Sequence, residues 1–386
     1  MRPVERHRAS MRDRAWPARD FRLWFSFLLL LLMFGFGTNT RVDAKERLPA
    51  WLADADLFEW VEIPDTQIDQ ADAWKNYKGA RGNTGKRGLL AYSGAAVKTR
   101  GSEFFIAGGG HLDYAGNEIF SIRLGDDLPQ WIRHNDPSTD TPMNTPYYPD
   151  GRPSSRHTYW NLVYDSKLDR LLFFGGAPWG DKPTYNNLVD SYNFSINDYD
   201  LPGTIASAPS LIGGPSGTGI DNNGNFYIHS HRNGHLYYWQ EKTNSWNDLG
   251  RKGGARNGIP YALDTKRHRL FRIPGSNSGA RYYDLNRNGL ITNVQITGPA
   301  AEQISSGSSM VYDPVTDIFW LWKRNEDTLY QINASTFIAM MRHTTGIKPT
   351  TSKEQVYGRF NYLPELKGLI LMVNSRTPLM FIRTAE

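Results

Sequence analysis

A strand–turn–strand unit that recurs along this 386-residue chain constrains its fold more than any other sequence feature. Each copy has an apolar strand, a polar turn that often begins with Asp, and a second apolar strand, as in LVYDSKLDRLLFFGG. Helical periodicity is nearly invisible, and this indicates an all-β chain. The clear copies are 162–176, 261–275 and 310–324, the looser ones are 218–232 and 360–374, and 95–109 is the first copy.

A further strand follows each copy and often ends on a Trp, as in 117–134 and 234–250. Four antiparallel strands per unit, repeated about every fifty residues, predict the blades of a β-propeller. The last unit ends at MFIRTAE without a fourth strand, and 57–66 looks like an outer strand whose blade is missing. We therefore expect the N-terminal strand to close a ring of six blades. The alternatives are seven blades, if 186–207 forms a weak one, and a two-sheet sandwich, which leaves the repeat unexplained.

The first 44 residues have the order of a secretory signal peptide. An Arg-rich stretch, 1–22, precedes the apolar run 23–37, and the small residues Val42 and Ala44 follow. The run is shorter than the roughly 20 residues that span a bilayer comfortably. We expect cleavage near Ala44 and a secreted or periplasmic protein; an uncleaved segment would instead be an N-terminal membrane anchor.

Charge and cysteine content exclude several function classes. The whole chain carries a net charge of +5, but residues 1–44 contain eight Arg and four acidic residues, so 45–386 carry only about +1 (5 − 4). A nucleic-acid partner is therefore not expected, because it needs a basic footprint on the folded part. The chain has no Cys, which excludes disulfides, thiolate metal sites and thiol nucleophiles. We expect a monomer that contacts a membrane only if the N-terminal segment is retained.

Two segments resemble the repeats of kelch or galactose-oxidase-type propellers. FIAGGGHLDYAGNEIF with Trp131, and LLFFGGAPWG, share paired glycines at a strand end, then a loop and a strand. The resemblance covers about 57–386 at the level of architecture and implies one kelch-like propeller domain in 45–386. Galactose oxidase is similar in fold only, since its copper site needs a cysteine that this chain lacks.

Propeller geometry gathers the candidate catalytic residues at one mouth. In each blade, the loop between the second and third strands opens on the same face as the entry to the next blade, and these loops usually hold the ligand. On this basis His111 and His157 are the acid/base candidates, Tyr159 or Tyr114 the proton donor, and Arg256 the carboxylate neutraliser. A tight turn at the glycine run and packing of RHTYW between blades are the competing interpretations.

Further residues of the same loops are candidates for substrate and metal binding. His229, His231 and His235 resemble a metal-ligand set, but no acidic residue lies beside them in the sequence, so no metal is assigned. The candidate substrate-binding residues are Arg156, Trp179, His231, Arg232, Asn257, Arg324 and Arg359.

A cationic, aromatic-lined mouth with His, Tyr and Arg suits an acidic polysaccharide. The three residue types together can carry out β-elimination on a uronic acid, and some secreted bacterial propellers, among them ulvan lyases, are similar in this respect. Hydrolysis is less favoured because no pair of carboxylates has a matching spacing. The alternatives are a propeller that binds a glycan or a protein without catalysis, and an isomerase or mutarotase of small sugars.

Overall fold

The computed structural model describes residues 48–79, 82, 85–182, 186–209, 212, 214, 217–254, 258–275, 279–324, 326–349 and 355–386. Leu48–Glu386 form one compact unit, separate from Met1–Arg47. The predicted signal peptide, 1–44, lies outside the described residues, so it stays a prediction. Within the described ranges, no helix is both long and apolar enough to cross a membrane.

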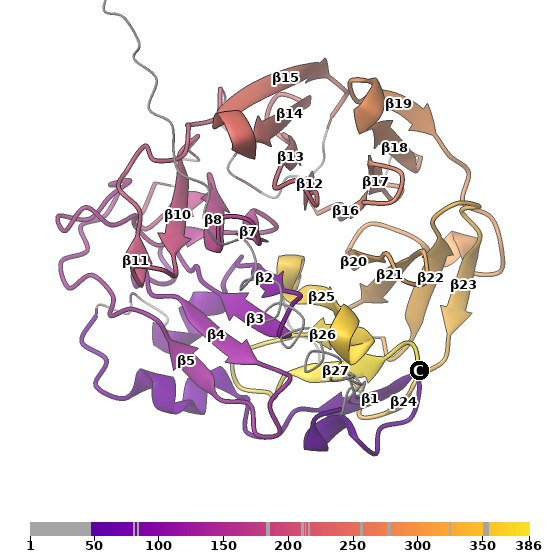
Figure 1. The fold of residues 1–386 in the computed structure, drawn as a ribbon, viewed down its shortest axis with the longest axis horizontal. Helices are drawn as coiled ribbons and strands as arrows, with labels where there is room; N and C mark the ends of the chain where they lie inside the picture. The colour runs from indigo at the N-terminus through magenta and orange to yellow at the C-terminus, as the bar shows by residue number, and fades with distance from the viewer. Residues whose placement is uncertain are drawn as a thin grey trace, which may run out of the picture. The chain divides into compact units, whose positions relative to one another are not determined.

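The unit Leu48–Glu386 is all-β, and its sheets form six antiparallel blades around a ring (Figure 1). Outside the strands, the helices of the described ranges are short 3-10 turns. Blades 1 to 3 contain β2 (Ala95–Lys98), β3 (Glu103–Ile106), β4 (Phe120–Arg123) and β5 (Trp131–Arg133); β7 (Leu162–Asp165), β8 (Arg170–Phe174), β10 (Val189–Asn193) and β11 (Asp198–Tyr199); β12 (Gly217–Ile220), β13 (Phe226–His229), β14 (His235–Gln240) and β15 (Ser245–Arg251).

The other three blades repeat this plan, and blade 6 uses both ends of the unit. They contain β16 (Tyr261–Asp264), β17 (Arg269–Arg272), β18 (Arg281–Asp284) and β19 (Leu290–Asn293); β20 (Ser308–Asp313), β21 (Ile318–Lys323), β22 (Leu329–Asn333) and β23 (Ala339–Arg342); β25 (Phe360–Leu363), β26 (Gly368–Leu371), β27 (Met380–Arg383) and β1 (Glu59–Glu62), with β24 (Thr345–Gly346) added at the edge.

The predicted propeller of six blades is confirmed. Segment 186–207 contains β10 and β11, the two outer strands of blade 2, so it does not form a seventh blade. The N-terminal strand β1 pairs antiparallel with β27 as the fourth strand of blade 6, with Trp60 opposite Ile382. This pairing closes the ring as expected, because it covers the edge that β27 would otherwise expose.

The Asp that recurs in the sequence repeat forms the turn between the first two strands of a blade. Asp165, Asp264 and Asp313 are fully buried, and each accepts backbone N–H bonds from the residues two and three positions later. A carboxylate that bonds its own chain in this way stabilises a tight turn. These turns lie at the ends of the strands opposite the predicted mouth.

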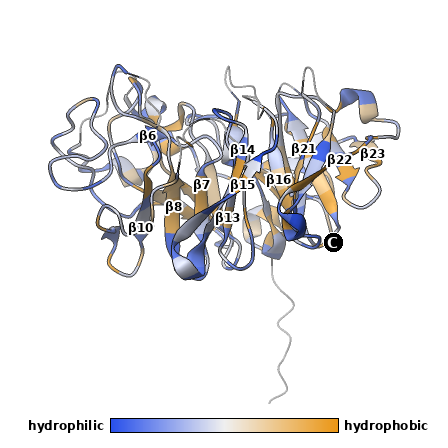
Figure 2. Ribbon diagram, turned by 90° about the horizontal axis from the view of Figure 1, so that it is seen from above, coloured by the Kyte–Doolittle hydropathy of each residue, from blue (hydrophilic) through white to orange (hydrophobic). Residues whose placement is uncertain are grey.

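Aromatic side chains fill the spaces between blades. The rings of Phe174 and Phe226 stack at 3.6 Å between blades 2 and 3, and those of Phe271 and Phe319 at 4.5 Å between blades 4 and 5. Seen from the side, apolar strand segments run through the ring and hydrophilic turns lie at its rims (Figure 2). This packing fixes the blades relative to one another without any disulfide.

The first strand of each blade faces the centre of the ring (Figure 1). These strands, β2, β7, β12, β16, β20 and β25, border a central cavity of about 230 Å³. At the mouth end it is lined by Trp160, Tyr261 and Tyr357. The mouth loops of neighbouring blades therefore meet around one depression.

Candidate functional site

The glycine run 108–110 places His111 beside the entry of blade 2. Gly108, Gly109 and Gly110 have φ angles of 146°, 108° and 67°, which L side chains rarely adopt. A Cβ on Gly110 would lie 2.6 Å from the backbone nitrogen of His157. The three glycines therefore let blade 1 press against β6 (Arg156–His157), and His111 follows directly, held by its N–H bond to the Pro178 carbonyl.

Asp113, His157 and Tyr159 form a chain of hydrogen bonds across two blades. Asp113 Oδ2 lies 3.0 Å from His157 Nε2, and Tyr159 Oη lies 3.3 Å from His157 Nδ1. Because a carboxylate accepts, Nε2 carries the imidazole proton and Nδ1 of the neutral ring accepts from the Tyr159 hydroxyl. The carboxylate thus fixes the tautomer in which His157 orients the Tyr159 hydroxyl.

His111 and Tyr92 complete the cluster on its solvent side. The His111 and His157 ring centroids lie 5.7 Å apart, and His111 is half-buried. Tyr92 lies over the His157 ring with centroids 4.7 Å apart and is 39% exposed. His157 itself is only 4% exposed. A ligand at the mouth would meet His111 and Tyr92 first, with His157 beneath them.

Three tyrosines occupy the same strained position in adjacent blades. Tyr92, Tyr159 and Tyr357 each stand three residues before the first strand of blades 1, 2 and 6, with φ angles of 49°, 48° and 45°. In blades 3 and 4 the same position is glycine, Gly214 and Gly258, also with positive φ. A bulky residue with positive φ costs of order 1 kcal/mol or more and persists mainly at functional sites.

Backbone bonds hold these three blade entries together. The Tyr159 N–H donates to the Tyr92 carbonyl at 2.9 Å, and the Gly358 N–H donates to the Tyr159 carbonyl at 3.3 Å. The rings of Tyr159 and Tyr357 meet edge to face at 5.4 Å. The cluster is therefore built on rigid contacts of blades 6, 1 and 2.

The same cluster has a donor set that could hold a divalent metal. One ligand atom each from His111, Asp113 and His157 lies within 4.8 Å of the others. Two imidazoles and a carboxylate suit zinc or another first-row metal. An ion would take the His157 Nε2 that now faces Asp113, so metal binding and proton relay are alternative uses of this ring.

Several other predicted site residues have structural partners. Arg156 is 2% exposed and its Nη2 lies 2.7 Å from the Asp190 carboxylate. Arg359 is equally buried and donates to backbone carbonyls, among them those of Leu90 at 2.9 Å and Met372 at 3.1 Å. Trp179 is 5% exposed, so its ring is covered. These contacts join the blades, and they leave no substrate role established for the three residues.

Tyr114, the alternative proton donor, lies in the core. It is fully buried, and its hydroxyl bonds Tyr77 Oη at 2.7 Å and also the Glu118 carboxylate. Burial raises the pKa of Glu118 to about 7, with the Tyr114 and Tyr77 hydroxyls opposing the shift. Of the two predicted tyrosines, Tyr159 is the one that contacts His157.

Two of the predicted histidines of blade 3, His229 and His235, contact different groups. His229 is fully buried, with Nδ1 2.9 Å from Tyr261 Oη and Nε2 2.9 Å from the Gly253 carbonyl, while His235 faces Asp248 at 2.9 Å. Burial lowers the pKa values of His229 and His231 to about 4. That no metal is assigned to His229, His231 and His235 stays a prediction.

Of the remaining predicted site residues, two lie in the part of the chain that the structure describes and two do not. Arg232 and Arg324 are exposed in the mouth loops of blades 3 and 5. Arg256 and Asn257 lie outside the described residues. The sequence analysis gave no role to Asp113, Tyr92 or Tyr357. Aligning YSGA, YWNL and YGRF on the strand starts would have revealed the shared tyrosine.

A scan against protein-family models and a search of curated proteins both find no match for this chain. The propeller fold therefore stands on the strand topology itself. The likeness to kelch repeats and to ulvan lyases stays a prediction.

Proposed function

We propose that this protein is exported and acts on an acidic, uronic-acid polysaccharide as a lyase, by β-elimination at the propeller mouth. The hydrogen-bonded series Asp113–His157–Tyr159 carries the proposal, because it links a carboxylate, an imidazole and a phenol within hydrogen-bond reach. Tyr92, Tyr159 and the other tyrosine at a blade entry, Tyr357, have strained backbone conformations, which is a property of preorganised sites.

The position and the hydrogen bonds of each side chain assign its role. Both ring nitrogens of His157 face protein groups, so His157 is a positioning residue that acts through Tyr159. His111 is half-buried and is the imidazole that a substrate can reach. Tyr159 is itself only 5% exposed, so a substrate reaches its hydroxyl beside the rings of Tyr92 and Tyr357. We assign this hydroxyl as the proton donor because it is the acidic group that His157 orients.

In the proposed step, His111 removes the proton at C5 of the uronic acid. The electron pair of this C–H bond forms the C4–C5 double bond, and the C4–O bond breaks. The leaving oxygen takes the proton of Tyr159, whose hydroxyl turns from His157 Nδ1 to the substrate for this transfer. The imidazolium of His111 then loses its proton to solvent, and Tyr159 regains one, so the site returns to its starting state.

The proposal is tested by incubating the purified chain with a panel of uronic-acid polysaccharides and recording the ultraviolet absorbance of an unsaturated product. Tyr159→Phe and His111→Ala should each lower turnover by about 10²–10⁴-fold with the fold intact. Tyr312→Phe is the matched control, because it removes a buried hydroxyl that bonds Asp317 at 2.8 Å on the opposite face. Turnover should survive a chelator, since the step uses protons and no metal.

Unchanged turnover in Tyr159→Phe would remove this hydroxyl from the mechanism. Loss of activity with the chelator, restored by added zinc, would assign His111, Asp113 and His157 to a metal instead.

A second candidate function is binding without catalysis. The exposed ring of Tyr92 at the mouth favours it, because an aromatic face can stack on a sugar whether or not a reaction follows. Retention of several polysaccharides without any product would support this platform. Activity confined to monosaccharides would indicate an isomerase or mutarotase.

A further inference from the structure

Arg272 and Arg281 bring two cations together at the mouth end of blade 4. They are the last residue of β17 and the first of β18, and they lie directly opposite each other in the strand register. Like charges in this arrangement destabilise a sheet. The pair therefore needs a compensating interaction.

Neither Arg272 nor Arg281 forms an ion pair with a carboxylate of the described residues. Arg272 is 1% exposed, yet its Nε and Nη1 have no hydrogen-bond partner in the described part of the chain. The Nε of the half-buried Arg281 is also without a partner there. A guanidinium does not lose its proton in a protein, so the buried charge persists.

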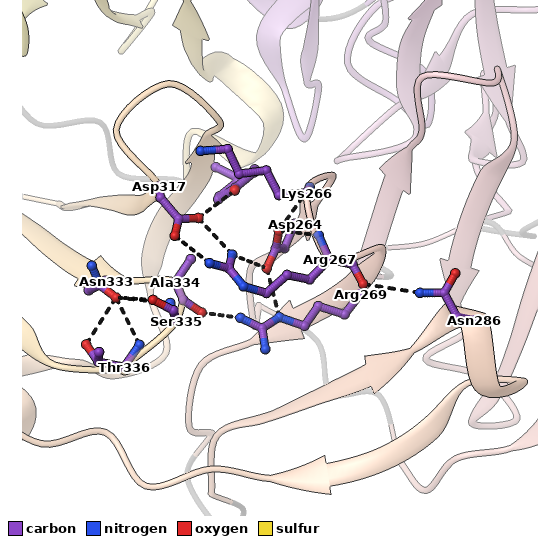
Figure 3. Close-up of polar contacts among 11 residues, drawn as sticks. Asp264, Lys266, Arg267, Arg269, Asn286, Asp317, Asn333, Ala334, Ser335 and Thr336 are labelled. Atoms are coloured by element: carbon purple, nitrogen blue, oxygen red, sulfur yellow. Dashed lines mark hydrogen bonds and ion pairs between the residues drawn. The ribbon is translucent and has the colours of Figure 1, made fainter.

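Arg269 shows what a satisfied arginine looks like in the same strand. Its Nε donates to Asp264 Oδ2 at 2.8 Å, and its other end donates to the Ala334 carbonyl (Figure 3). Arg269 stands three residues before Arg272, on the side of β17 that faces blade 5. Arg269 and Arg272 are both strongly buried, so they differ in their partners and not in their burial.

The groups around Arg272 are neutral. Tyr261 lies opposite it in the β16–β17 register, and Tyr261 Oη lies 2.9 Å from His229 Nδ1. The rings of His229 and Tyr283 lie 4.9 Å apart. Burial, reinforced by the two arginines, lowers the pKa of His229 to about 4, and burial raises the pKa of Tyr261 well above its ordinary value. None of these groups supplies a negative charge at neutral pH.

We propose that Arg272 and Arg281 form an oxyanion-binding site at the interface of blades 3 and 4, which takes a sulfate or carboxylate group. Guanidinium groups bind such oxygens in pairs, and the partly covered site strengthens the attraction. Tyr261 also lines the central cavity, together with Trp160 and Tyr357 near the candidate catalytic cluster. That the oxyanion belongs to a polysaccharide rests on the proposed function; oxyanion binding itself does not.

Inorganic sulfate is the first probe, titrated into the purified chain at constant ionic strength with chloride as the balancing ion. Sulfate should raise the melting temperature by about 1–4 °C at saturation, as for a ligand that binds only the folded state. Arg272→Met should weaken sulfate binding at least tenfold in calorimetry. Without sulfate, this variant should melt at or above the wild-type temperature, because a buried charge without a carboxylate partner is gone, although its hydrogen bond to Tyr261 is lost with it.

Arg269→Met is the matched control. It should lower the melting temperature, because Asp264 and the Ala334 carbonyl lose their donor, and it should keep the wild-type response to sulfate. Arg281→Met, at a half-buried position, serves as the second variant if Arg272→Met does not fold. Wild-type sulfate affinity in either mouth variant, or no sulfate-specific shift in the wild type, would overturn the proposal.

A sulfated polysaccharide and its desulfated form then identify the source of the oxyanion. Tighter binding of the sulfated form, abolished by Arg272→Met, would place a polymer group in the site. Binding of free sulfate alone would keep the oxyanion site and reject its link to a polymer. Neither result depends on turnover, so a failed lyase assay would leave the sulfate result standing.

Discussion

The two faces of the ring treat charge differently. On the face away from the mouth, Arg267 lies between two aspartates, with Nη1 3.0 Å from Asp264 Oδ2 and Nη2 2.5 Å from Asp317 Oδ2 (Figure 3). At the mouth, Arg272 has no carboxylate among the described residues, and the Asp113 carboxylate orients a histidine. One face uses charge to hold blades 4 and 5 together, whereas the other leaves buried arginine nitrogens without a carboxylate among the described residues, as the proposed oxyanion site requires.

This difference indicates that the mouth contains the less stable interactions of the two faces. A satisfied ion network at the turns joins neighbouring blades, because Arg267 contacts Asp264 of blade 4 and Asp317 of blade 5. Asp264 also accepts backbone N–H groups of its own turn. The mouth combines opposed arginines with three tyrosines in a backbone conformation better suited to glycine. Such unfavourable features are retained at sites that are organised in advance for a ligand.

The largest effect is expected from Asp264→Ala on the face away from the mouth. It should lower the free energy of unfolding by about 3–5 kcal/mol, because it leaves the buried Arg269 without its ion-pair partner and weakens the turn. Urea denaturation measures the change, and Asp248→Ala, at an exposed contact with His235, is the control with an effect of under about 1 kcal/mol. A small effect at Asp264 would mean that the network adds little.

The next effect is a pH dependence of the same network. Arg267 is the main cause that lowers the pKa of Asp317 to about 2, with Tyr312 assisting and burial opposing. Because this pKa is depressed on folding, its stabilisation is complete above the ordinary Asp pKa near 4 and is lost as pH falls toward about 2.

At most about 2 kcal/mol should disappear in that window, since the pair is partly exposed. Denaturation between pH 5 and pH 2 measures it, with Arg267→Met as the control that should flatten this part of the slope. An unchanged slope in the control would assign the acid sensitivity to other carboxylates.

The smallest effect is expected at the mouth, where two contributions oppose each other. Tyr92→Gly relieves the strain of a φ of 49°, worth of order 1 kcal/mol, but it loses the packing of the ring on His157. The free energy of unfolding should therefore fall by less than in Phe337→Gly, at another positive φ but packed on Phe271 and less exposed. Turnover or glycan binding should fall in Tyr92→Gly alone. Equal losses of stability in the two variants would contradict the contrast between the faces.

Much of the fold could be predicted from the sequence, because the repeat is local. Asp264 and Asp313 form their own turns by accepting hydrogen bonds from backbone N–H groups two and three residues later. The position of such an Asp in the sequence therefore indicates where the first two strands of a blade meet. The closing strand was recognisable as an outer strand without a blade at one end and a blade without an outer strand at the other.

The candidate site was only partly predictable. The meeting of His111 with His157 follows from propeller geometry and is observed, with ring centroids 5.7 Å apart. The burial of Arg156 was one of two interpretations that the sequence left open, and the burial of Arg359 was not expected. A guanidinium at a blade entry points to solvent or between blades according to contacts that lie far away in the sequence.

The sequence by itself determined the all-β repeat, the six blades and the closure of the ring, since these depend on short-range patterns of apolar residues, turns and strand ends. Only the tertiary structure decided that Asp113 orients His157, that Tyr159 completes the chain, and that Arg272 is buried opposite Arg281. These contacts join residues from different strands or blades. Their distances and burial are set by how blades pack, and a one-dimensional pattern does not record that packing.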